Sequence, residues 1–108
     1  MLDTALEPAR LEAKASAAAD FLRVMANEKR LMILCQLVSG EKSVGQLLEG
    51  SDLSQSALSQ HLAKLRDEKL VTTRRSGQTI FYAIDHQAAA RLLETLADIF
   101  CPDLRENP

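Results

Sequence analysis

The stretch that most constrains this fold lies near the middle of the chain, at residues 53–65. Its apolar residues have the spacing of one helix face, and they are Leu58, Leu62 and Leu65. Ser54 stands where a helix takes its N-terminal cap, and Leu53 and Leu58 occupy the two positions of a hydrophobic staple. These residues therefore predict a helix that begins just after Ser54 and ends near Lys69.

The opposite face of this helix is polar and almost uncharged. Side chains of this kind can bond base edges, as a glutamine does with adenine, or phosphates. The candidates for DNA contacts on this face are Ser54, Gln55, Ser56, Ser59, Gln60 and His61, with Lys64 as a candidate for a phosphate. The alternative interpretation is a polar face that only keeps a surface helix solvated, so the neighbouring elements decide between the two.

Two more helices are expected before this one. Asn27 can cap a helix that Gly40 ends, and a capping box at residues 43–46 opens a third, short helix. The expected buried stripe of the first of these helices is Leu31, Leu34, Cys35 and Val38. A break at residues 50–52 leads into the helix at 53–65. Two short helices joined by a tight turn, the second polar on its outer face, form the helix-turn-helix pattern.

A β-hairpin is expected directly after these helices. Residues 70–75 and 78–84 are rich in β-forming side chains and flank Ser76-Gly77, where the glycine suits a turn. Arg74 and Arg75 lie close to the tip of this wing, where arginines can contact the phosphates beside a groove. Protection of an exposed edge strand is the alternative, and the preceding helix-turn-helix favours the phosphate contacts.

The distribution of charge is uneven along the chain. The net charge is −2, but residues 54–84 carry five basic and two acidic side chains, whereas residues 85–108 carry two basic and five acidic ones. A basic middle beside an acidic tail suits a protein that touches phosphate with one surface only.

Length and composition favour one mainly helical domain over residues 1–108, with residues 1–7 and 103–108 expected to be disordered. Aromatic residues make up only 4% of the chain and there is no Trp, so the core must be built from aliphatic side chains. No apolar run is long enough to cross a bilayer, and the N-terminus lacks the pattern of a signal peptide. We therefore expect a cytoplasmic protein with no membrane partner and with both cysteines reduced.

Helices are also expected at the two ends of the domain, one from Pro8 to about Met25 and one from Asp85 or His86 to just before Pro102. The first is rich in alanine, which suits either a plain surface helix or a close contact with another helix. The last has a broad apolar face made of Ala89, Leu92, Leu93, Leu96, Phe100 and Cys101. A small domain cannot easily cover this surface alone, so we expect a two-fold homodimer through these two helices.

The order of elements, four helices, a small β-hairpin and a last helix, is that of a winged helix-turn-helix in the α+β class. Together with the local sequence it resembles the arsenic-repressor (ArsR/SmtB) family of winged-helix transcription repressors over nearly the whole chain. Residues 26–35, ANEKRLMILC, are similar to the family's second helix. Residues 53–62, LSQSALSQHL, are similar to its recognition helix, and residues 78–82, QTIFY, to its wing strand.

Within that family the chain is most similar to the sulfide- and persulfide-responsive branch, which includes the biofilm growth-associated repressors. Cys35 and Cys101 match the two cysteine positions of this branch. The resemblance implies a homodimer that binds an inverted repeat in double-stranded operator DNA. It also implies that reactive sulfur species are the inducer and that the repressed genes detoxify sulfide.

Each of the two cysteines taken alone is expected to be a small buried hydrophobe. They are far apart in the sequence, so only the tertiary fold can bring them together. A disulfide needs Cα atoms within about 7 Å, whereas a bridge with inserted sulfur atoms tolerates a longer gap. Persulfide or polysulfide acting on a Cys35–Cys101 dithiol is therefore the hypothesised signal. A general oxidant that forms a disulfide is the alternative.

Metal sensing, enzyme activity and protein binding are the other function classes to weigh. Two thiols and two scattered histidines do not form the usual four-ligand metal site, although a site at Cys35 and Cys101 shared across a dimer stays open. No cofactor or catalysis is expected, because Ser59 and His61 point in different directions from one helix and there is no Cys-x-x-Cys pair. The basic wing argues against a module that binds protein.

Overall fold

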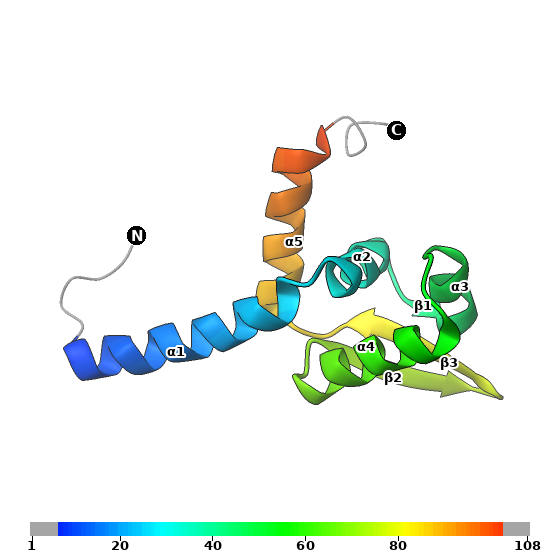
Figure 1. Cartoon of the computed structure of the whole chain (residues 1–108), viewed down its shortest axis with the longest axis horizontal. Coiled ribbons are helices and arrows are strands. Elements are labelled where there is room, and N and C mark those ends of the chain that lie inside the picture. Colours follow the sequence, from blue (N-terminus) through cyan, green and yellow to red (C-terminus); the bar gives the residue numbers. More distant parts are fainter. Residues whose placement is uncertain (1–6, 103–108) are drawn as a thin grey trace.

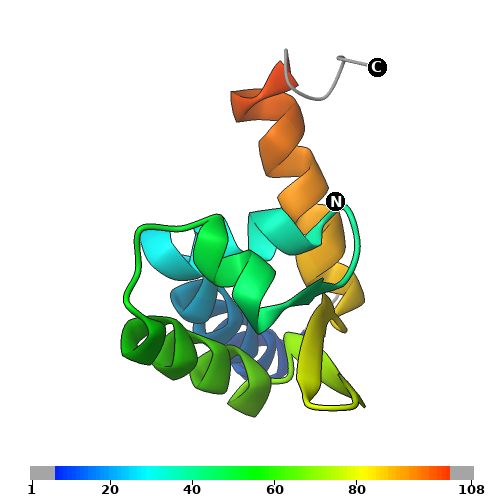
Figure 2. The same cartoon turned by 90° about the vertical axis from the view of Figure 1, so that its right-hand side faces the viewer.

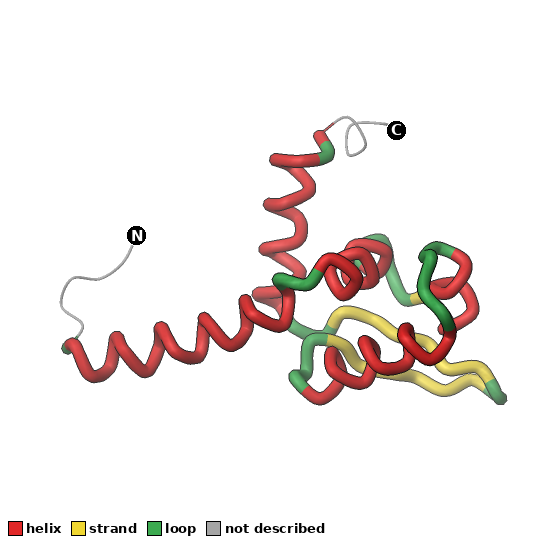
Figure 3. Tube along the Cα trace, in the orientation of Figure 1, coloured by secondary structure: helices red, strands yellow, loops and turns green. Residues whose placement is uncertain are grey.

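The computed structural model describes residues 7–102 as four helices, a small sheet that includes a two-residue strand, and a last helix (Figure 1). The expected disorder of residues 1–7 and 103–108 falls outside these residues, except at Glu7, the exposed N-cap of the first helix. The elements are α1 (Pro8–Met25), α2 (Glu28–Leu37), β1 (Lys42–Ser43), α3 (Val44–Glu49), α4 (Gln55–Asp67), β2 (Val71–Ser76), β3 (Thr79–Ile84) and α5 (Gln87–Phe100). The mainly helical composition is plain in Figure 3.

The helices of the helix-turn-helix begin where their capping residues predict. The side chain of Asn27 accepts a hydrogen bond from the backbone N–H of Arg30 at 3.0 Å, which caps α2. At α3 the capping box is complete: Ser43 Oγ accepts from the N–H of Gln46 at 3.1 Å, and Gln46 Oε1 accepts from the N–H of Ser43 at 2.9 Å. Ser54 Oγ caps α4 by accepting a hydrogen bond from the backbone N–H of Ala57 at 3.2 Å. These bonds satisfy backbone donors that would otherwise have no partner in the helix.

The core is built from side chains of all five helices and the sheet. Its most deeply buried side chains are Ile33, Leu34, Leu47, Leu58, Leu62, Leu65, Leu70 and Leu93. The apolar stripe predicted for α4 is confirmed, because Leu58, Leu62 and Leu65 are all at most 2% exposed. This packing orients α4 with its polar side outward.

The buried stripe predicted for α2 is wrong in part. The residues that face the core are Ile33, Leu34 and Leu37. Leu31 and Val38 are only half-buried, and Cys35 is exposed. Both sets have helical spacing, so the pattern alone could not tell which face meets the core.

The wing is a three-stranded antiparallel sheet in the order β1-β3-β2, not the two-stranded hairpin predicted from the sequence. The added strand, β1, pairs Lys42 with Tyr82 and Ser43 with Phe81. Two residues are too few to show an alternating pattern. The turn of the hairpin also lies one residue later than expected, because Ser76 pairs with Thr79. Gly77 is in this turn with a φ of 64°, a conformation that favours glycine.

The two terminal helices project from this body (Figure 1). Only Val24 and Met25 of α1 are buried, and Figure 2, a view roughly along α1, shows α5 rising above the other elements. Large apolar side chains are exposed on both helices, among them Leu22 at 50%, Ile99 at 62% and Phe100 at 75%. The ring of Phe21 stacks on His86 with centroids 4.9 Å apart, which joins the end of α1 to the start of α5. Among the described helices none has the length and hydropathy of a membrane span.

Candidate functional site

An exposed ion pair joins the turn between α3 and α4 to α2. Lys29 Nζ of α2 donates a hydrogen bond to Asp52 Oδ1 in this turn at 3.0 Å. The bond, and then the positive charge of Lys29, lower the pKa of the Asp52 carboxyl. This contact links α2 to the turn that leads into α4. The polar face of α4 carries most of the predicted DNA contacts.

The outer face of α4 brings together the side chains that the sequence singled out there. All but one of them are exposed, and these are Ser54, Gln55, Ser56, Ser59, Gln60 and Lys64. Lys64 forms an ion pair one turn along the helix with Glu68, at 3.7 Å. With the leucines of α4 turned into the core, these donors and acceptors form a continuous polar strip that can enter a DNA groove.

His61 differs from these neighbours. It is half-buried at the flank of α4. Desolvation, and then the positive charges of Arg30 and Lys29, lower the pKa of the His61 side chain. The His61 imidazole therefore favours its uncharged form more strongly than an ordinary histidine does.

The two wing arginines, predicted as a pair, lie on opposite faces of the sheet. Side chains alternate along a strand, so Arg75 shares the face of Val71, which is buried against the helices. Arg74 shares the other face with its cross-strand partner Phe81. Arg75 makes no ion pair with another residue of the described range.

Arg74 is instead paired with Glu41, which precedes β1. The guanidinium makes two hydrogen bonds to this carboxylate, of which the bond from Nε to Oε2 is 3.2 Å long. Its Cζ atom also lies 4.6 Å from the centroid of the Phe81 ring, within the range of a cation–π contact. The hydrogen bond to Arg74 lowers the pKa of the Glu41 carboxyl. Sequence reasoning missed Glu41 and Phe81, because nothing local shows that β1 joins the sheet.

The two cysteines line one apolar groove between α2 and α5, with a volume of about 380 Å³. Its walls are Leu31, Cys35, Val38, Leu93, Leu96, Ala97, Phe100 and Cys101, with no charged side chain among them. Cys35 is exposed and Cys101 half-buried, so the prediction of a buried Cys35 is wrong. Desolvation of the thiol by these walls, and then the nearby Cys101, raise the pKa of Cys35.

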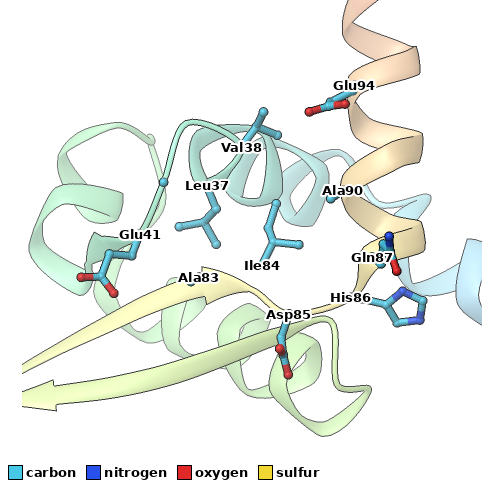
Figure 4. Close-up of a pocket in the computed structure, with 11 residues that line it drawn as sticks. Leu37, Val38, Glu41, Ala83, Ile84, Asp85, His86, Gln87, Ala90 and Glu94 are labelled. Carbon is cyan, nitrogen blue, oxygen red and sulfur yellow. The ribbon is translucent and has the colours of Figure 1, made fainter.

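A second hollow, with a volume of about 450 Å³, lies where α2, the end of β3 and the start of α5 meet (Figure 4). Three carboxylates line it, those of Glu41, Asp85 and Glu94, and in Figure 4 they point away from one another. Between residues 7 and 102 no group of three or more His, Cys, Asp or Glu side chains is placed to hold a metal ion. These three carboxylates are therefore not arranged to share a metal ion.

A helix-turn-helix whose second helix has an exposed polar face, followed by a small sheet with an arginine near its tip, defines the winged helix-turn-helix class of DNA-binding proteins. Residues 27–73 match the model of a bacterial regulatory protein family, the arsR family. The chain belongs to the ArsR family of DNA-binding transcriptional regulators.

Similar proteins in this family have different named roles. The chain is 53% identical to nodulation protein NolR of Rhizobium meliloti, over 82% of this chain and 73% of NolR. It is 44% identical to the biofilm growth-associated repressor of Agrobacterium fabrum, over 84% of this chain and 78% of that protein. Among solved structures, reduced HlyU from Vibrio cholerae has a TM-score of 0.81 and 46% identity, covering 84% of this chain and 96% of HlyU.

Proposed function

We propose that this regulator is a homodimeric, cytoplasmic repressor whose release from operator DNA is triggered by reactive sulfur species at Cys35 and Cys101. The observation that carries the proposal is the shared groove: two thiols from distant parts of the chain face one apolar space between α2 and α5. The similarity to a biofilm growth-associated repressor supports the assignment of repression. Control of sulfide-detoxification genes follows from the inducer that we propose.

DNA recognition in this proposal uses α4 and the wing. The proposed base-reading residues are Gln55, Ser56, Ser59 and Gln60 on the exposed face of α4 and His61, which is half-buried at its flank. Ser54, the exposed N-cap of α4, is a further proposed DNA contact. Lys64 and Arg75 contact phosphates, whereas the guanidinium of Arg74 is already bonded to Glu41. In a two-fold dimer the two recognition helices would lie about 34 Å apart, so they would read an inverted repeat in successive major-groove segments.

Dimer contacts are assigned to α1 and α5, because these helices carry four of the five large apolar side chains that are exposed among the described residues; the fifth is Met32 of α2. Leu11, Leu22, Ile99 and Phe100 are all exposed in the single chain. Burial of apolar surface is the main driving force for association, and a two-fold arrangement would cover both copies of this surface at once.

The sensing chemistry needs a persulfide donor, R–S–SH, as co-reactant. A cysteine thiolate attacks the outer sulfur of the donor, the donor S–S bond breaks, and R–SH leaves with a cysteine persulfide formed. When both cysteines carry this group, the persulfide anion of Cys35 attacks the sulfur attached to Cβ of Cys101. HS⁻ then leaves, and a three-sulfur bridge joins the two residues. Each step conserves atoms and electrons.

The bridge would tie α2 to the end of α5, and α5 also belongs to the proposed dimer contact. A shift of α5 would change how the two copies of α4 are spaced. Couplings between sites are typically about 1–3 kcal/mol, or roughly 5- to 150-fold in affinity, which is enough to release an operator.

The test measures DNA binding of the reduced, polysulfide-treated, peroxide-treated and zinc-treated dimer on a duplex that the reduced protein selects from a random pool. Polysulfide should weaken binding, Cys35→Ser and Cys101→Ser should abolish the response, and mass spectrometry should show a linked sulfur chain. A response to peroxide alone would assign a disulfide switch. A response only to added zinc would assign metal sensing, and no response in any arm would leave a constitutive DNA binder.

A further inference from the structure

The side chains of Glu41, Arg74 and Phe81 link β2 and β3 to the residue that precedes β1. Phe81 lies on the central strand β3, opposite Ser43 of β1 on one side and Arg74 of β2 on the other. The guanidinium of Arg74 lies over the Phe81 ring and reaches Glu41, the residue just before β1. The side chain of Arg74 on the edge strand β2 is thereby bonded to the residue that precedes β1, the strand at the other edge of the sheet.

That segment leads directly into the helix-turn-helix. Glu41 follows Gly40, whose φ is 137°, and precedes β1, and Ser43 at the end of β1 is the N-cap of α3. We propose that Glu41, Arg74 and Phe81 act as a clamp that fixes the wing relative to α3 and α4. Arg74 is then a positioning residue, and the arginine that contacts phosphate is Arg75.

The geometry supports a clamp more strongly than a loose surface ion pair. Two hydrogen bonds from one guanidinium to one carboxylate fix the orientation of both groups. The Phe81 ring beneath adds a third contact that a lysine would not reproduce as well. The hydrogen bond raises the pKa of Arg74 and lowers the pKa of Glu41, so each group stabilises the charged form of the other.

The decisive variant is Glu41→Gln, because the two roles of Arg74 predict opposite results. If Arg74 is a clamp residue, this change frees the wing and weakens binding to a pool-selected duplex, by about three- to tenfold for coupling energies of the usual size. If Arg74 contacts phosphate, the same change releases the guanidinium and removes a nearby negative charge, so binding becomes tighter. Glu49→Gln on α3 is the matched control, since Glu49 is exposed and makes no ion pair within the described residues.

Salt dependence and additivity give independent readouts. The slope of log affinity against log salt should not change in Arg74→Ala, whereas loss of a phosphate contact lowers it by about 0.9. The double variant Glu41→Gln with Arg74→Ala should bind no more weakly than Arg74→Ala alone, because either change opens the clamp. Tighter or unchanged binding by Glu41→Gln, or a reduced slope in Arg74→Ala, would overturn the proposal.

A measurement without DNA checks the contact itself. In an NMR titration the pKa of the Glu41 carboxyl should be below its ordinary value in the wild-type protein and return to it in Arg74→Ala. A titration that Arg74→Ala does not change would also overturn the clamp. This test stands whether or not the cysteines sense sulfur.

Discussion

Arg74 and Arg75 are adjacent in the sequence, yet their side chains leave opposite faces of the wing. The first lies over Phe81 and is bonded to Glu41, whereas the second is on the face that packs against the helices and has no ion-pair partner among the described residues. Strand alternation alone separates their surroundings. Two arginines that look equivalent in the sequence can therefore have different roles in DNA binding.

Replacement of Arg75 by alanine should weaken binding to all DNA sequences to a similar extent. A lost phosphate contact should also lower the salt slope by about 0.9, because one fewer counterion is released on binding. Titration of specific and random duplexes at several salt concentrations measures both quantities. Arg91→Ala on α5 is the control, because it removes an exposed arginine that is not among the predicted DNA contacts. An Arg75→Ala protein with the wild-type slope would remove this residue from the interface.

Disruption of the proposed dimer contact should be clearest at Ile99, which is 62% exposed on α5 and does not line the dithiol groove. In Ile99→Asp a charge would be buried between the two protomers without a partner, so the dimer should dissociate. Sedimentation equilibrium at several protein concentrations measures this change. Gln87→Asp, at the exposed start of α5, should remain dimeric. A dimer in Ile99→Asp would place the contact elsewhere.

The reactivity of Cys35 should rise steeply with pH. Partial desolvation of the exposed Cys35 thiol by the groove walls raises its pKa, so at neutral pH little of it is the reactive thiolate. In the Cys101→Ser variant, the rate of Cys35 alkylation by iodoacetamide should therefore increase about tenfold for each unit that the pH is raised, as long as the pH stays below the pKa. The midpoint should lie above that of a cysteine in a short, uncharged peptide measured alongside. A rate that is already constant between pH 7 and 8 would contradict the raised pKa.

The raised pKa of Cys35 also determines whether the protein becomes more or less stable as the pH rises. Because the folded state holds the Cys35 proton more tightly than the unfolded state does, stability from this group is present at neutral pH. It is lost as the pH rises from the ordinary thiol pKa of the unfolded state through the raised pKa of the folded state. The Cys35→Ser protein should lack this loss in urea titrations compared across that range.

Loss of the α3 cap should destabilise the fold without changing its architecture. Ser43→Ala removes the acceptor for the N–H of Gln46, and such changes typically cost about 1 kcal/mol. Urea unfolding at a fixed protein concentration measures the difference in free energy. Ser39→Ala is the control, because the Ser39 hydroxyl makes only a long, exposed hydrogen bond to Gln36. Equal stability of the two variants would show that the cap contributes little.

The sequence signals that predicted this fold correctly are local ones. Asn27, Ser43 and Ser54 each act on an N–H three positions along the chain, so their caps could be identified without knowing the tertiary structure. The face of α4 was equally clear, because its apolar and polar residues separate cleanly around the helix. Most of the predicted DNA contacts could be placed on one surface for this reason.

The features that the sequence missed depend on contacts between distant residues. Cys35 has the spacing of a core residue, but α2 has apolar side chains on two faces, and only the packing of α4 and α5 decides which face is buried. Glu41 and Arg74 are 33 positions apart and meet through a strand of two residues. No periodic pattern records a pairing of this kind.

Ser43 belongs to two elements at once, since it is the last residue of β1 and the N-cap of α3. No spacer exists at this junction, so inserting or deleting one residue there would break the strand pairing and the helix start together. Length variation among natural variants of this chain should therefore be concentrated at the hairpin turn after Ser76, and it should be absent around Ser43.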